Sequence, residues 1–514
     1  MTSVPRMLAV VIVVGIVAPA CADPQVSRLI DEQITARLRE AKVAPVGRAD
    51  HATLVRRIYL DLLGRPPTST EAEVYLSDPA ADKHYRLIRK LRDYPETAAH
   101  WRRVIAGWLQ GPQGGELLGY LAGSVVHNRG WDQVARELLD PDPRQPAHGG
   151  AAAYLEHFLQ GEDKKAGREA ATVAVASAFF GAQLQCARCH DHPTVPAWTK
   201  AHFEGLRAFF DHTEVASSSR ADLAESGLRL IETTVRKGAT RPMFLDGTTF
   251  NPGDRPRTRL AQHALRPEAV HFKQAVVNRV WKELLGRGLV EPVDMIHDGN
   301  PASHPALFER LADDFAANGF NFDRLLASIM NSDTYLRSDR WPGPGDRRPA
   351  PELFAVAELR PLSGPQTAWA AAVATGYHRE IVTSSRRAGF PMRGPGLPLE
   401  ARSLWEGTEQ YAKLADRFRA GRPATTAGDA IYLTFDPFVK ALLDPKWGLV
   451  REMMDEDDDE GAVTLAYVSV LSRRPSPDEL SVVRAHIKSA KTRAEGCRDV
   501  VWALLAGAEF RFNH

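Results

Sequence analysis

Apolar residues recur at helical spacing along most of the chain. Over residues 23–41 they fall three or four positions apart with charged residues between them, which predicts an amphipathic helix. A second helix is expected over 52–63 and ends at Gly64, which is followed by an arginine and two prolines. Thr68, with Glu71 three positions later, predicts a third helix that begins with a capping box.

The remaining helical segments form two blocks. Further helices of the first block are expected over 81–92, 97–109, 131–139 and 167–184. The Gly-rich segment 111–124 and the Pro/Gly-rich segment 140–150 predict loops. The second block extends over 258–514, with Pro/Gly-rich interruptions at 341–351 and 389–399.

Helical periodicity is lost over 213–256. Two short runs there, 228–236 and 241–245, are strand-like and flank a Lys-Gly pair, which predicts one small hairpin. We therefore expect a mostly α-helical fold, with two helical domains and a small β-hairpin element between them. The expected division is a signal peptide at 1–22, a helical domain at 23–212, a linker with short strands at 213–254 and a helical domain at 255–514.

One stretch of sequence occurs twice. Residues 58–71 align without gaps on residues 466–479, and both predict a helix, an Arg/Pro stop, a Ser or Thr cap and a new helix. Two widely separated copies do not make a solenoid, which needs tandem repeats. We interpret the similarity as one helix–turn–helix solution used twice, which concerns architecture and not chemistry.

Composition and charge narrow the class of protein. Of the 514 residues, 44% are hydrophobic and 25% are charged, as in a folded globular protein. The 65 Lys and Arg are balanced by 64 Asp and Glu, so no electrostatic argument supports a nucleic-acid partner. Four cysteines are too few for a disulfide scaffold.

The N-terminus resembles an export signal. Arg6 precedes the apolar run 7–17, and small residues follow, so cleavage is expected after Ala20 or Ala22. The run is shorter than the ~20 apolar residues of a membrane-spanning helix. The protein is therefore expected outside the cytoplasm, in the periplasm or secreted. It is expected at a membrane only if Cys21 is lipidated or the signal stays uncleaved.

The chemistry-bearing motif is C-x-x-C-H at residues 186–190, the attachment sequence of c-type haem. Two thiols three positions apart add to the haem vinyl groups, and the adjacent histidine is held under the iron. This predicts Cys186 and Cys189 as thioether attachments and His190 as an axial ligand. Chance occurrence at this composition is roughly one in a thousand.

Two other interpretations of the same segment stay open. A tetrahedral zinc site needs four ligands, and the candidates are Cys186, Cys189, His190 or His192, and His202 or His212. The two cysteines could instead pair as a disulfide in an oxidising compartment. In the haem interpretation, the candidate sixth ligands are His202, His212 and Met243, and no sequence feature selects among them. The remaining Cys497 is expected to be a buried small hydrophobe.

Other polar segments have structural explanations. The acidic run 455–460 is expected to be a solvated linker before a helix, and Ser303 is expected to cap a helix that has Pro305 in its first turn. Walker A, Rossmann, serine-hydrolase and H-E-x-x-H patterns are absent from the sequence. No catalytic residues are therefore identified, and the sequence does not decide whether the protein is an enzyme.

Two long stretches resemble known families. Residues 54–68 (LVRRIYLDLLGRPPT), 180–193 (FGAQLQCARCHDHP) and Trp198-Thr199 resemble the planctomycete cytochrome-c-like domain PSCyt-two. A second group of motifs resembles the planctomycete domain PSD-one: residues 257–261, 277–281, 286–292, 300–305, 326–335 and 509–510. His202 stands where PSCyt-two relatives usually carry another polar residue.

The resemblance implies an exported protein built from two domains of unknown function. Such proteins often neighbour sulfatase-like genes, which implies a part in handling sulfated polysaccharides. The preferred hypothesis is a haem-c protein for electron transfer or redox support, with an unidentified redox partner. The alternative is a non-enzymatic scaffold that binds polysaccharide-processing proteins, with zinc or no cofactor at the Cys/His cluster. A sugar-directed enzyme is a weaker third option.

Overall fold

The computed structural model describes residues 24–142, 145–215, 230–233, 238–251, 253, 255–379 and 437–514. These parts of the chain are mostly α-helical and contain two small antiparallel sheets of two strands each. The signal peptide expected at 1–22, with Cys21, and the Pro/Gly-rich interruption at 389–399 lie outside the described residues.

The helices of the first block are α1 (Pro24–Glu40), α2 (His51–Leu63), α3 (Ser69–Ser77), α4 (Lys83–Arg92), α5 (Pro95–Trp108), α6 (Gly115–Val126), α7 (Trp131–Leu139), η1 (Pro146–His148), α8 (Gly149–Leu159), α9 (Lys164–Phe180), η2 (Cys186–Arg188) and α10 (Lys200–Arg207). Those of the second block are α12 (Pro256–Ala264), α13 (Val270–Leu285), α14 (Pro305–Ala317), α15 (Phe322–Met330), α16 (Asp333–Leu336), η3 (Gly345–Arg347), η4 (Pro351–Leu353), α17 (Gly364–Ala374), α21 (Pro437–Leu442), α22 (Gly448–Asp455), α23 (Asp459–Leu471), α24 (Pro477–Ser489), α25 (Arg493–Ala506) and α26 (Ala508–Arg511).

Several predicted helix boundaries are confirmed. Helices α1, α2 and α7 lie where the apolar spacing predicted them. Asp50 caps α2 by accepting the Thr53 N–H at 2.8 Å, and Gly64 ends it with a left-handed φ of 70°. The predicted capping box of α3 is also present, because Thr68 and Glu71 each accept the other's backbone N–H.

The loop predicted at 111–124 is wrong, because α6 occupies most of it. Leu117 and Leu121 are fully buried, and α6 packs between α5 and α8. Burying a leucine is worth about 1.5–3 kcal/mol, which exceeds the cost of about 1 kcal/mol for one helical glycine. Tertiary packing therefore overrides the local signal of the glycines.

The β element between the two blocks is confirmed, but its predicted strand partner is wrong. β1 (Thr213–Val215) pairs antiparallel with β2 (Leu230–Glu232). Residues 241–245 turn back locally instead, with a bridge from Met243 to Thr249. A second sheet joins β3 (Arg360–Pro361) to β4 (Phe512–Asn513). Pairing of such short strands depends on distant partners, which local patterning does not identify.

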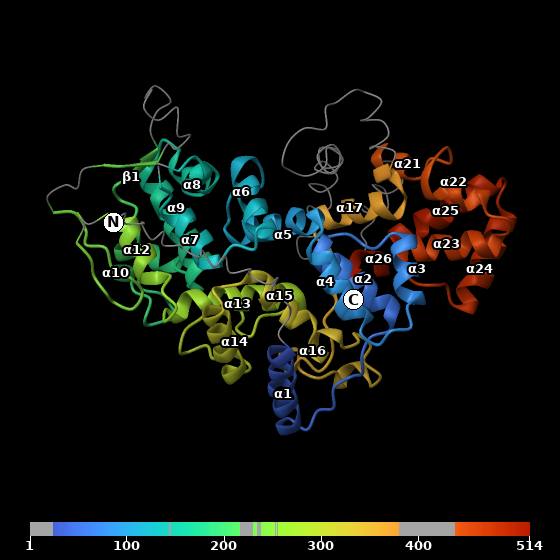
Figure 1. Ribbon diagram of the computed structural model, residues 1–514, viewed down its shortest axis with the longest axis horizontal. Helices are drawn as coiled ribbons and strands as arrows, with labels where there is room; N and C mark the ends of the chain where they lie inside the picture. Colours follow the sequence, from blue (N-terminus) through green and yellow to red (C-terminus); the bar gives the residue numbers. More distant parts are fainter. Residues whose placement is uncertain are drawn as a thin grey trace, which may run out of the picture.

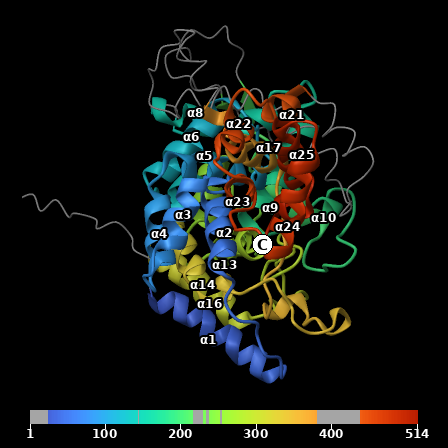
Figure 2. The same cartoon turned by 90° about the vertical axis from the view of Figure 1, so that its right-hand side faces the viewer.

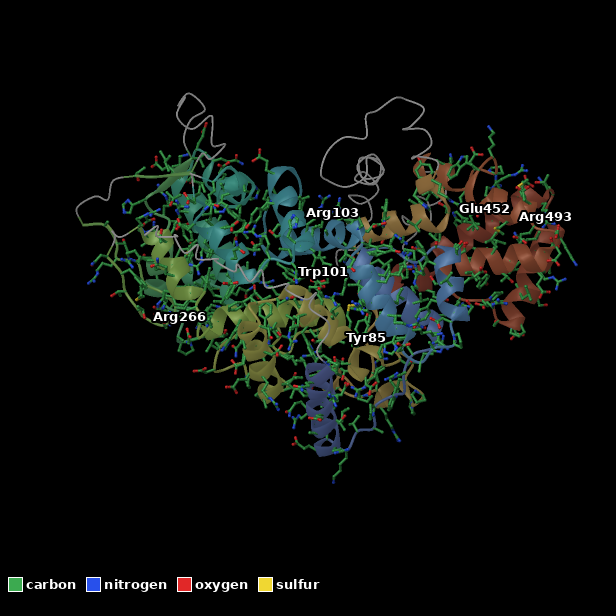
Figure 3. The ribbon with its side chains drawn as sticks, viewed as in Figure 1. Tyr85, Trp101, Arg103, Arg266, Glu452 and Arg493 are labelled. Carbon is green, nitrogen blue, oxygen red and sulfur yellow. The ribbon has the colours of Figure 1, made fainter. Side chains whose placement is uncertain are left out.

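Two hydrophobic cores organise the described residues. The first contains buried side chains from Val26 to Val356, so both helical blocks contribute to it. Trp101 of α5, labelled in Figure 3, belongs to this core and is 1% exposed. Its ring meets that of Phe322 of α15 edge-on, with centroids 5.2 Å apart. In the described residues, the second core combines buried side chains from 362–374 and 439–510 with one residue of α2, Leu60.

The repeated sequence adopts a repeated geometry. Arg65 donates two hydrogen bonds to Glu71, at 2.8 and 3.0 Å, and Arg473 donates two to Glu479, both at 2.8 Å. Each guanidinium also lies over a tyrosine ring, and these rings belong to Tyr59 and Tyr467. Helix α24 repeats the capping box of α3. The interpretation of one helix–turn–helix solution used twice is confirmed.

The two copies lie side by side in the fold. Helices α2 and α3 are beside α23 and α24 in both views (Figures 1 and 2). Arg56 of α2 is 2% exposed and donates to the carbonyls of Val470 and Phe510, at 3.0 and 2.8 Å. Helix α2 of the first block is therefore packed together with the C-terminal helices α23 and α26. None of the helices in the described ranges has the length and apolar character needed to span a bilayer.

Candidate functional site

The C-x-x-C-H segment begins just after the end of α9. Gly181 ends that helix with a left-handed φ of 61°. A Cβ at this glycine would lie 2.6 Å from the Ile296 side chain, so the turn also requires glycine for space. Ala182 and Leu184 then enter the core with no exposed surface. The chain is thus fixed immediately before Cys186.

The two thiols of the segment lie on one short helical turn. Cys186 begins the 3-10 helix η2, and the Cys189 N–H donates to the Cys186 carbonyl at 3.4 Å. Ala187 between them is fully buried, whereas both cysteines are exposed and unbonded to each other. The turn therefore anchors one side in the core and presents both sulfur atoms to the outside.

Hydrogen bonds at the ring Nδ1 atoms distinguish His190 from His192. The His190 Nδ1 lies 2.7 Å from the Asp191 carbonyl. Because a carbonyl only accepts, this contact assigns the proton to Nδ1 and leaves the Nε2 lone pair free. The His192 Nδ1 instead accepts the N–H groups of Thr194 and Val195, at 3.3 and 3.2 Å, which assigns its proton to Nε2.

His202 and His297 have the same arrangement as His192. The His202 Nδ1 takes part in the capping box of α10, 2.8 Å from the Thr199 hydroxyl and 3.4 Å from the Thr199 nitrogen. The His297 Nδ1 accepts the Gly299 N–H at 3.1 Å. These imidazoles present Nε2–H as a donor, whereas a metal ligand needs a lone pair. Of the four, His190 is the one prepared to coordinate through Nε2.

The predicted zinc ligands are not gathered around one point. Within the described ranges, no three Cys, His, Asp or Glu side chains converge closely enough to hold a metal ion. Of the candidate sixth ligands, His202 has its imidazole engaged in the capping box of α10. His212 and Met243 are held by their backbones: the His212 carbonyl accepts the Thr233 N–H at 2.7 Å, and the Met243 N–H donates to the Gly205 carbonyl at 3.0 Å.

A loop from the second block, residues 291–300, packs against the C-x-x-C-H segment. The Ile296 N–H donates to the Gly181 carbonyl at 2.9 Å, and Ala182 forms an antiparallel bridge with Met295. Sequence reasoning missed this loop, because nothing in its local pattern points to a partner more than a hundred residues earlier.

Two buried side chains of α13 hold this loop in place. Asn278 is fully buried and donates to the Val293 carbonyl of the loop at 3.2 Å and to the Val290 carbonyl just before it at 2.8 Å. Arg279 donates to the carbonyl of Ser177 in α9 at 2.8 Å, and the Ser177 hydroxyl donates to Asp294 at 2.8 Å. Helix α13 thus connects the loop to the helix that leads into the cysteines.

Trp198 connects histidines of the two blocks. Its indole is 3% exposed and meets His192 and His297 edge-on, with ring centroids 5.4 and 5.3 Å away. Partial burial, together with the charges of His297 and His190, lowers the pKa of His192. The imidazoles of His190 and His297 therefore lie close enough to that of His192 to influence its protonation.

Three other sequence interpretations have clear outcomes. Cys497 is fully buried, as predicted, and burial raises the pKa of its thiol. The acidic run is a linker only at residues 456–458, because α22 ends at Asp455 and α23 begins at Asp459, and Asp458 caps α23 by accepting the Gly461 N–H at 2.7 Å. The predicted Ser303 cap is wrong. The N-cap of α14 is His304, and the Ser303 hydroxyl lies 3.1 Å from the His304 Nδ1 instead of accepting a backbone N–H of the helix.

Comparison with known proteins assigns the two blocks that contribute to the site to two different families. Residues 29–215 match the family PSCyt2, described as a protein of unknown function (DUF1549). Residues 256–402 match the family PSD1, also described as a protein of unknown function (DUF1553). No curated protein and no solved structure matches the chain significantly. The cysteines lie in the first matched region and His297 in the second, and the chain therefore contains a PSCyt2 region followed by a PSD1 region.

Proposed function

We propose that this protein is exported and carries one covalently attached c-type haem at Cys186 and Cys189, with His190 as an axial ligand. The proposal is supported chiefly by the His190 imidazole, whose Nδ1 is bonded to the Asp191 carbonyl at 2.7 Å. A histidine that ligates a metal through Nε2 typically donates its other ring N–H to such an acceptor.

The cysteines meet the other requirement of attachment. Both thiols are exposed on one turn whose buried Ala187 fixes it to the core, so the turn can present them to a planar ring without unfolding. When bound, the haem iron supplies one-electron redox chemistry. The chain itself holds the ring by two thioether bonds and fixes the His190 tautomer. Electron transfer or redox support is the function that this arrangement favours.

A pyridine haemochrome spectrum tests the proposal directly. The protein is exported with its own signal from a host that matures c-type cytochromes. We expect a reduced spectrum of a two-thioether haem and haem staining that survives denaturing electrophoresis. The double substitution Cys186→Ala and Cys189→Ala removes both signals, whereas Cys497→Ala, at a buried thiol in the other core, leaves them intact.

The outcomes separate the alternatives. A colourless protein, from cells whose own cytochromes are mature, contradicts haem attachment. Haem staining that persists in the double variant contradicts the assignment of these cysteines. Export is tested separately by cell fractionation and by sequencing the mature N-terminus, where a start at Cys21 or Asp23 is expected and an intact Met1 contradicts cleavage.

A further inference from the structure

The loop 291–300 brings a PSD1 residue to the edge of the PSCyt2 site. Asn300 closes this loop by donating to the carbonyls of Glu291 and Met295, at 3.1 and 2.9 Å. The loop is also bonded to Gly181, just before the cysteines. These hydrogen bonds fix the position of the loop in the folded protein, and a residue that contacts a cofactor needs such a fixed position.

His297 is the polar ring that this loop presents. Its Nδ1 accepts the Gly299 N–H at 3.1 Å, so the neutral imidazole carries its proton on Nε2. One edge of the ring is packed against Trp198, 5.3 Å between centroids. His297 is only partly buried, and its Nε2–H has no acceptor among the described residues, so it is available to a bound group.

The charged residues around the site are of both signs, so a bound carboxylate would be held by individual hydrogen-bond donors and not by a net positive charge. Arg188 and Lys200 are exposed cations, but Asp191 and Asp298 are exposed acids in the same two segments. The Asp191 carboxylate already accepts the backbone N–H of Lys200 at 2.8 Å. A haem has two carboxylates that need hydrogen-bond donors when they leave water. Beside the Arg188 guanidinium, which lies 3.8 Å from the Glu169 carboxylate, the imidazole N–H groups are therefore directed donors that can bind a carboxylate.

We propose that His297 of the PSD1 region donates its Nε2–H to a carboxylate of the haem attached at Cys186 and Cys189, so that both family regions build one cofactor site. The inference rests on the proposed function and goes beyond it, because it gives the second region a part in holding the cofactor. His192, whose Nε2 also carries its proton, supplies a matching donor from the first region.

Chemical footprinting of His297 tests this contact. Diethyl pyrocarbonate modifies free imidazoles, and peptide mass spectrometry reports the rate at His297 alone. We expect modification about tenfold slower in the haem-loaded protein than in the Cys186→Ala/Cys189→Ala variant, as a hydrogen bond to a charged group implies. His127, exposed at the end of α6, is the internal control and reacts equally in both.

Substitution gives a second readout. His297→Ala removes the donor, leaves a carboxylate unpaired beside the ring and favours ferric iron, so the reduction potential falls. His297→Gln keeps an N–H donor and retains a potential nearer to that of the wild type, and His127→Ala changes nothing. Haem content stays the same in all three variants, because attachment depends on the cysteines.

The results distinguish the two proposals. A wild-type protein without covalent haem overturns both the proposed function and this inference. A haem-loaded protein in which His297 reacts at the same rate as in the cysteine variant overturns this inference alone. A reduction potential that falls equally in His297→Ala and His297→Gln contradicts a donor role and assigns His297 to packing against Trp198.

Discussion

Arg360 holds the carboxylate of Asp61 with two hydrogen bonds, at 2.7 and 2.8 Å. The same carboxylate accepts the Tyr335 hydroxyl and the Asn513 amide, both at 2.7 Å. The Asp61 side chain is only 4% exposed. One buried acid of α2 therefore connects α16, β3 and β4, which lie far apart in the sequence. Such a group is tolerated in the interior because every partner is present.

Asp61→Ala is expected to destabilise the protein by about 3–5 kcal/mol, because it leaves the buried Arg360 guanidinium without its counter-ion. Urea unfolding followed by circular dichroism measures the loss. Asp82→Ala is the matched control, since that acid is 64% exposed in its ion pair with Arg86 and its loss is expected to cost at most about 1 kcal/mol. Equal losses in the two variants contradict the role given to Asp61.

The two copies of the arginine–glutamate motif are expected to differ in strength. The Arg65 side chain is 8% exposed and that of Arg473 is 24% exposed. Arg65→Ala leaves the Glu71 side chain, 25% exposed, without its partner, whereas Arg473→Ala leaves Glu479 and Glu509, which are 34% and 37% exposed and can be hydrated. We expect a cost of about 3 kcal/mol for Arg65→Ala, against about 1–2 kcal/mol for Arg473→Ala. Comparing the urea midpoints of both variants checks the order, and a larger loss for Arg473→Ala contradicts it.

Acid stability is expected to depend on Glu479. Hydrogen bonds from Arg473 lower the pKa of Glu479 to about 2, against the ordinary value of 4.5. The folded state therefore binds this proton less readily than the unfolded state. The resulting stability is complete above pH 4.5 and is lost as the pH falls towards 2. Glu479→Gln is expected to flatten the stability profile in that window, whereas Glu73→Gln at an exposed site of α3 preserves its slope.

His304 is expected to add a second slope at higher pH. Burial and the charge of Arg37 lower the pKa of His304 from 6.5 to about 4. The unfolded state thus takes up a proton before the folded state does, and stability falls as the pH drops from 6.5 towards 4. Unfolding of His304→Asn across this range measures the contribution. A slope as steep as in the wild type contradicts it, and His157→Asn at an exposed position serves as control.

Local patterns predicted much of the helical structure. The capping boxes, the Gly64 stop and the limits of α7 depend on neighbouring residues, so they are readable in the sequence. The prediction of a loop at 111–124 was wrong where burial of Leu117 and Leu121 outweighed the glycines. The hairpin partner was wrong because strand pairing depends on residues distant in the chain.

The sequence alone determined the helical class, the duplicated helix–turn–helix and the position of Cys186, Cys189 and His190, since each is a pattern over a few consecutive residues. The tertiary structure decided the rest of the site. It assigned the tautomers of His190 and His192 through backbone partners. It also brought His297 to Trp198 through the loop 291–300, which is anchored by the buried Ile296. These contacts depend on packing between segments that are distant in the chain, and no local spacing encodes that packing.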